Sequence, residues 1–356
     1  MSVQVRRAAL AAVMVTMLAV TAGSPVSAAA VKLQISVGID DFSYCVSGSG
    51  VPRAIHVASL RTRDDEPRSR IRREADRRGR WFGCFNSIHG APIFINAGDV
   101  IKVRVAGQKR RFTIPDIRPR THRVGDVIRG RGPVGATIQV SVDRGGFTEV
   151  DPGVARDVTV NGRGRWRLDL SGHYDIKGTD QISVALADDG LYVFSNSLAP
   201  HVKLDAGGNV LEGAVNPGRT VRFRLVDGDG VTRATASASE INSGRYAVSL
   251  QDERGNAVYP RAGDRIESDI AADGQLLIPA SYLRASASDD RIKAGCMPHS
   301  GFELFTSGED YRFFAGRTRD DGTLRRSADL EVGDFVELTC RYESGDQLRL
   351  VTDAGR

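Results

Sequence analysis

Residues 164–186, GRWRLDLSGHYDIKGTDQISVAL, contain the two signals that decide the fold. The first is a glycine placed two residues before a bulky apolar residue, Gly164 and Trp166, where the alternating segment 166–170 begins. The second is the turn from Gly178 to Asp180, which opens the alternating segment 181–186. Alternation of apolar and polar residues predicts strands with one buried side and one solvent-facing side.

Both signals return along the chain. The first reads Gly79-Arg80-Trp81, Gly164-Arg165-Trp166, Gly244-Arg245-Tyr246 and, weakly, Gly322-Thr323-Leu324, at spacings of 85, 80 and 78 residues. The second reads Gly98-Asp99, Gly178-Thr179-Asp180, Gly263-Asp264 and Gly333-Asp334. Repetition at a nearly constant period indicates a string of similar small domains. The apolar residues after each aspartate also keep one phase, and a one-residue slip would turn core side chains to solvent.

The first thirty residues have the features of a cleaved signal peptide. Arg6 and Arg7 precede an apolar run at 8–20 that is too short to span a bilayer comfortably, and Val26-Ser27-Ala28 has the small-x-small form of a cleavage site. No later apolar stretch approaches membrane length. We therefore expect an exported chain without a transmembrane anchor.

Recurring connectors set the expected domain boundaries. Phe112-Thr113-Ile114-Pro115 matches Leu276-Leu277-Ile278-Pro279, and proline ends strand pairing. We expect a signal peptide at 1–30 and four units at 31–116, 117–203, 204–287 and 288–356. Short strands, 39 glycines and only 6% aromatic residues predict an all-β chain built as a tandem array of four small antiparallel β-sandwiches, each with a separate interior.

The sequence also resembles a known family. A Val-x-Gly-x-x-x-Pro-Gly-like opening, the Gly-x-Trp/Tyr middle and the Gly-Asp close are similar to bacterial immunoglobulin-like domains, which occur in tandem on exported surface proteins. The resemblance covers nearly the whole mature chain. It implies spacers, stalks or binding modules, and it brings no general catalytic residues. The fourth unit departs most, with Leu324 at the aromatic position.

The chain has four cysteines: Cys45, Cys84, Cys296 and Cys340. An even number in an exported chain predicts disulfides, for which three pairings exist. Locality favours Cys45–Cys84 and Cys296–Cys340. We expect the second pair to bridge two sheets and the first to lie nearer a rim. A zinc site of four thiolates lacks any Cys-x-x-Cys spacing.

Motifs for catalysis and metal binding are missing from the sequence. The six histidines have no metal-ligand spacing, and no Gly-x-Ser-x-Gly elbow is present. Asp227-Gly228-Asp229-Gly230 lacks the later glutamate of a calcium loop and reads as a hairpin turn. Trp81 and Trp166 lie on the apolar phase, which favours core packing. We therefore expect no catalytic residue, no metal and no cofactor.

The most unusual segment, 61–80, holds nine arginines and five acidic residues. A partial helical pattern near 66–78 would place Arg70, Arg73 and Arg77 on one face. One interpretation is a solvated, salt-bridged excursion from the first unit. The other is an anion-binding patch, because the arginine fork suits phosphate and carboxylate. Its candidate residues are Arg70, Arg72, Arg73, Arg77 and Arg78.

The formal net charge of +5, or +3 without the leader, is too small for a dedicated nucleic-acid binder. We expect a secreted, non-enzymatic binding or spacer protein of the cell envelope. We expect it to be either free or loosely held at the cell wall, and to have no nucleic-acid partner. Expected partners are an anionic cell-wall polymer, a glycan or another extracellular protein. Two alternatives stay open: a carbohydrate-binding module protein that uses exposed Tyr192 or Tyr259, and a hydrolase with a cryptic site.

Overall fold

The structure is a computed structural model. It describes residues 32–39, 43–144, 153–205, 208–239, 244–270, 275–278, 281–307 and 311–355. The predicted signal peptide lies outside the described residues. No helix in these ranges is long and apolar enough to cross a membrane.

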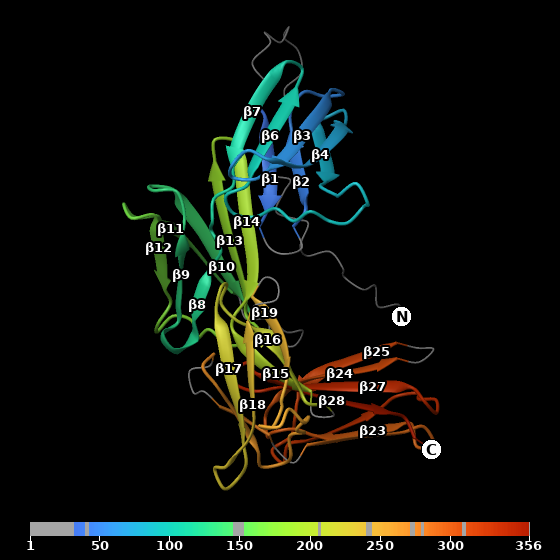
Figure 1. Cartoon of the computed structure of the whole chain (residues 1–356). Coiled ribbons are helices and arrows are strands. Elements are labelled where there is room, and N and C mark those ends of the chain that lie inside the picture. The colour runs from blue at the N-terminus through green and yellow to red at the C-terminus, as the bar shows by residue number, and fades with distance from the viewer. Residues whose placement is uncertain are drawn as a thin grey trace. The chain divides into compact units, whose positions relative to one another are not determined.

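The described chain is nearly all β-structure and runs through four successive groups of seven strands (Figure 1). The first group is β1 (Gln34–Gly38), β2 (Cys45–Ser49), β3 (Ile55–Arg61), β4 (Pro67–Glu74), β5 (Arg80–Cys84), β6 (Val100–Val105) and β7 (Gln108–Thr113). The second is β8 (Arg120–His122), β9 (Val127–Arg131), β10 (Thr137–Asp143), β11 (Val154–Thr159), β12 (Arg165–Asp169), β13 (Gln181–Asp188) and β14 (Leu191–Leu198), with the short 3-10 helix η1 (Arg123–Gly125) after β8.

The third group is β15 (His201–Asp205), β16 (Val210–Ala214), β17 (Thr220–Val226), β18 (Thr232–Ser239), β19 (Arg245–Ser249), β20 (Arg265–Ser268) and β21 (Gln275–Leu277). The fourth is β22 (Tyr282–Ser286), β23 (Arg291–Gly295), β24 (Gly301–Ser307), β25 (Arg312–Arg317), β26 (Thr323–Ser327), β27 (Phe335–Arg341) and β28 (Gln347–Asp353).

Every group divides its strands between two antiparallel sheets in the same way. In the first group, β1, β2 and β5 pair in one sheet, and β4, β3, β6 and β7 pair in the other. The other three groups repeat this order. The predicted all-β tandem array of sandwiches is confirmed. In the immunoglobulin constant fold the fourth strand belongs with the first, second and fifth; here it joins the opposite sheet.

The groups are joined in pairs by shared sheets, which the sequence does not predict. Strand β14 pairs in parallel with β1, so one seven-stranded sheet runs β11-β10-β13-β14-β1-β2-β5 (Figure 1). Strand β28 pairs in parallel with β15 in the same way, giving the sheet β19-β16-β15-β28-β27-β24-β25.

The prediction of four separate interiors is wrong. Buried apolar residues form two clusters, one between Leu33 and Ala199 and one between Val202 and Ala354. Each cluster spans two groups of strands because the shared sheet continues from one group into the next. Residues Leu33–Arg356 form one compact unit, so the boundaries at 116/117, 203/204 and 287/288 stay a prediction. Strand β15 runs across the second boundary, and β22 lies just before the third.

The repeated glycine-aromatic signal has a steric cause. Gly79 has a φ of +78°, and a Cβ there would lie 2.2 Å from the carbonyl oxygen of Gly50. The bulky residue that follows is buried in all four groups: Trp81, Trp166, Tyr246 and Leu324. Both tryptophans therefore pack in the core, as predicted.

The aspartate of the Gly-Asp turn holds that turn closed. In each group its carboxylate accepts a hydrogen bond from the backbone N–H three residues earlier, at 2.8–2.9 Å. In three groups the carboxylate is buried and also pairs with an arginine, as Arg68–Asp99, Arg144–Asp180 and Arg233–Asp264. Three of the four groups therefore share a buried ion pair as well as the turn.

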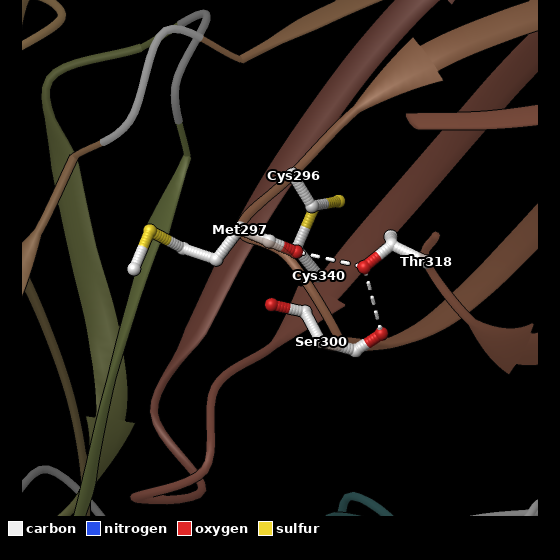
Figure 2. Close-up of a disulfide and its surroundings, with 5 residues drawn as sticks. All are labelled: Cys296, Met297, Ser300, Thr318 and Cys340. Atoms are coloured by element: carbon white, nitrogen blue, oxygen red, sulfur yellow. Dashed lines mark hydrogen bonds between the residues drawn. A yellow bond between two sulfur atoms is a disulfide. The ribbon is translucent and has the colours of Figure 1, made fainter. Parts of the chain in front are cut away.

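The two disulfides have the predicted local pairing. Cys45 and Cys84 are direct cross-strand partners on β2 and β5 within one sheet. Cys296 follows β23 and bonds to Cys340 on β27, so this bridge joins the two sheets of the fourth group. The segment after Cys296 is held by Thr318, whose hydroxyl donates to the carbonyl oxygen of Met297 at 2.7 Å (Figure 2).

Candidate functional site

The arginine-rich segment is a strand with a turn at either end, so the expected helical face does not form. Strand β4 covers Pro67–Glu74, and its buried residue is Ile71. Because side chains alternate along a strand, Arg70 and Arg72 lie on the face opposite Ile71. Arg73 shares the side of Ile71, and both contact the Gly83 position.

Arg77 and Arg78 lie in the turn between β4 and β5. The five candidate arginines therefore occupy three different places. Of these five, only Arg70 and Arg72 lie on the outer face of the sheet that contains β3 and β4.

Neighbouring strands add cations to that surface. On β3, Ser59 pairs with Arg70 of β4 and with Lys102 of β6, and Lys102 pairs with Arg111 of β7. These four residues form one cross-strand row. Two residues away on β3, Val57 pairs with Arg72 of β4 and with Arg104 of β6, and Arg104 pairs with Lys109 of β7, which gives a second row. The two rows define the basic face, whose cationic residues are Arg70, Arg72, Lys102, Arg104, Lys109 and Arg111.

A groove of about 480 Å³ lies on the basic face. Its floor includes the small outward residues of β3, Val57 and Ser59. Its lining contains no carboxylate; the lining residues are Val57, Ser59, Arg61, Pro67, Arg68, Ser69, Arg70, Lys102 and Arg104. Adjacent strands lie about 4.8 Å apart, so the banks on β4 and β6 are separated by about 10 Å.

Acidic neighbours neutralise some of these cations. Asp65 accepts a hydrogen bond from Lys102 at 2.7 Å and pairs with Arg61 at 3.1 Å. The bond from Lys102 and the surrounding positive charges keep the pKa of Asp65 below its usual value, so this carboxylate stays ionised at neutral pH. Arg68 pairs with the buried Asp99.

Four cations of the basic face lack a carboxylate partner in the described part of the chain. Within the described ranges, Arg70, Arg72, Arg104 and Lys109 form no ion pair. All four are exposed. Arg70 and Arg104 line the groove, and Arg72 and Lys109 lie beside it, so the basic face keeps an unbalanced positive charge that an anion can neutralise.

Sequence reasoning missed the half of the basic face that comes from β6 and β7. The signal was present, because Lys102 and Arg104 alternate with the buried Ile101, Val103 and Val105. The apolar phase of this alternation identifies the core side of the strand, and the polar phase carries the two cations.

The other sequence candidates form no chemical centre. In the described part of the chain, no three His, Cys, Asp or Glu side chains are placed to hold a metal ion. Asp227 accepts hydrogen bonds from the backbone N–H groups of Asp229 and Val231, as expected of a hairpin turn. Tyr192 and Tyr259 are 38% and 56% exposed.

Two histidines are buried and held neutral. His56 stacks on Trp81 with ring centroids 5.5 Å apart, and burial lowers its pKa. Burial also lowers the pKa of His201 to about 4. Both side chains belong to the core rather than to a reactive site.

Comparison with known proteins gives only distant likeness. No protein-family model matches the chain, and no curated protein matches it. A tetra-tandem repeat from the extending region of a large adhesion protein is 13% identical over 90% of this chain and 98% of that chain, with a TM-score of 0.17. The BSP domain of a biofilm-associated protein is 10% identical over 91% and 96%, with a TM-score of 0.19.

A structure from a 1.5-MDa bacterial ice-binding adhesin is 12% identical over 92% of this chain and 96% of that chain, with a TM-score of 0.17. Likeness this low carries no argument about function. A functional proposal for this chain therefore rests on its own surfaces.

Proposed function

We propose that this chain is an exported, non-enzymatic protein of the cell envelope that binds anionic envelope material through the basic face of its first group of strands. The carrying observation is the unbalanced charge of Arg70 and Arg104 in a groove that has no carboxylate in its lining, with Arg72 and Lys109 exposed beside it on the same face. Oriented cations around a concave surface raise the local concentration of anions and speed their association.

The remaining groups of strands act as a spacer in this proposal. Their repeated sandwich order supports modules of the immunoglobulin-like type, although the fourth strand belongs to the other sheet. Two disulfides are consistent with an oxidising compartment, where such bonds persist. The expected leader at 1–30 supplies the route of export.

The proposal is tested by sedimentation of the purified mature chain with isolated envelope material from the producing cell. We expect retention at low salt and release as salt is raised, because exposed charges are screened. Arg70→Ser with Arg104→Ser should reduce retention, and Arg77→Ser with Arg78→Ser is the control that removes the same charge from the turn. Equal retention by both double variants would refute a role for the basic face.

A further inference from the structure

The groove on the basic face has a direction. Its floor follows the outward residues of β3, and its two banks come from the strands that flank β3 on either side. Arg70 of β4 lies opposite Lys102 of β6 across Ser59, and Arg72 lies opposite Arg104 across Val57. Successive rows are two residues apart on each strand, or about 7 Å.

This arrangement selects the shape of the ligand. A compact anion would reach one bank or one row. A linear chain that lies along β3 and carries repeated negative charges can reach both banks and both rows at once. The floor favours such a chain, because the Val57 side chain offers an apolar contact and the Ser59 hydroxyl can donate or accept one hydrogen bond.

The types of cation in the two rows indicate which anionic group the ligand carries. Arginine supplies three of the four cations in these two rows, and of these Arg70 and Arg104 line the groove while Arg72 lies beside it. The planar fork of arginine binds two oxygens of one phosphate. A phosphodiester presents two such oxygens at every repeat, and the links between phosphates are uncharged carbon chains that suit an apolar floor. On the strength of the proposed function, we infer that the groove holds one linear phosphodiester polymer, extended along β3 between the β4 and β6 banks.

The experiment blocks the groove without changing its charge. Ser59→Trp fills the floor, whereas Ile55→Trp places the same ring on the same face of β3 at a position that is 44% exposed and outside the groove lining. Ile55 is exposed and Ser59 is half-buried on the outer face of β3, so circular dichroism and thermal unfolding must show that each variant folds. Binding is measured by titrating each protein with poly(glycerol phosphate) and, separately, with polyglutamate.

We expect Ser59→Trp to weaken poly(glycerol phosphate) binding by about tenfold or more, since it removes several charge-assisted contacts at once. Ile55→Trp should stay close to the unmodified chain. If Ser59→Trp binds normally while Arg70→Ser with Arg104→Ser does not, the groove is not the binding path and the basic face alone acts. If polyglutamate binds as tightly as poly(glycerol phosphate), the assignment to phosphodiesters is wrong. If neither polymer binds the unmodified chain, this inference is wrong, whereas the proposed function fails only if the chain is also not retained by isolated envelope material.

Discussion

The aspartate of the Gly-Asp turn offers a test of the repeat within one molecule. Asp264, ahead of β20, is buried, accepts the N–H of Arg261 at 2.8 Å and pairs with Arg233. Asp334, ahead of β27, accepts the N–H of Glu331 at 2.8 Å but is only partly buried. Within the described residues, its carboxylate forms no ion pair. The change to alanine therefore removes a buried pair in one case and a single hydrogen bond in the other.

The two losses differ in magnitude. Removing one partner of a buried ion pair costs about 3–5 kcal/mol, because the remaining charge is left unbalanced. We expect the low end for Asp264→Ala, since the Arg233 side chain is 18% exposed and water can reach it. Loss of one hydrogen bond near solvent costs about 1 kcal/mol, which we expect for Asp334→Ala. At a typical urea slope, the first change lowers the unfolding midpoint by about 1 M or more, and the second by less than about half of that.

The assay is urea unfolding followed by far-ultraviolet circular dichroism and by tryptophan fluorescence. Both tryptophans, Trp81 and Trp166, belong to the first core cluster, whereas Asp264 belongs to the second half of the chain. Circular dichroism should therefore report the loss, and the fluorescence transition should move less. Arg233→Ala combined with Asp264→Ala should cost less than the sum of the single changes. Equal midpoints for Asp264→Ala and Asp334→Ala would refute the reasoning.

Three further predictions concern binding, pH and the second disulfide. Asp65→Asn should strengthen binding to poly(glycerol phosphate) about two- to fivefold by releasing Lys102, and a titration that shows weaker binding would contradict this. His201 has a folded pKa of about 4 against 6.5 unfolded, so its contribution of about 3 kcal/mol should be complete above pH 6.5 and lost as the pH falls through 4. Thermal unfolding between pH 7 and 4 checks this, and His201→Gln should flatten the curve. Replacing Cys296 and Cys340 by serine opens a link across 44 residues and should cost about 4 kcal/mol, measured as a lower unfolding midpoint; no change would show that the bridge adds nothing.

Local features of the fold could be predicted from the sequence because they depend on local physics. Strand phase follows from alternation, as in 181–186, and the turn glycines follow from backbone conformation, as at Gly79. The pairing of β14 with β1 could not be predicted, because it joins residues more than 150 positions apart by backbone bonds that carry no side-chain signature.

The candidate site was half predictable for a similar reason. The arginine density of 61–80 is visible in the sequence, but its spacing also fits a helix, and that pattern grouped Arg70 with Arg73 and Arg77. A strand separates these residues, because neighbouring side chains point to opposite faces. Lys102 and Arg104 enter the site through cross-strand register alone, which sequence spacing does not encode.

The parallel pairing of β14 with β1 sets the smallest fragment of this chain that is worth expressing. A fragment cut near residue 116 would keep β1 but lose the strand that covers its outer edge, and an uncovered edge is a template for aggregation. Fragments cut between β14 and β15, near residue 199, would keep each shared sheet and each core cluster whole. Separate expression of these two fragments would still break one contact, because Arg123 of the first fragment pairs with the buried Asp346 of the second.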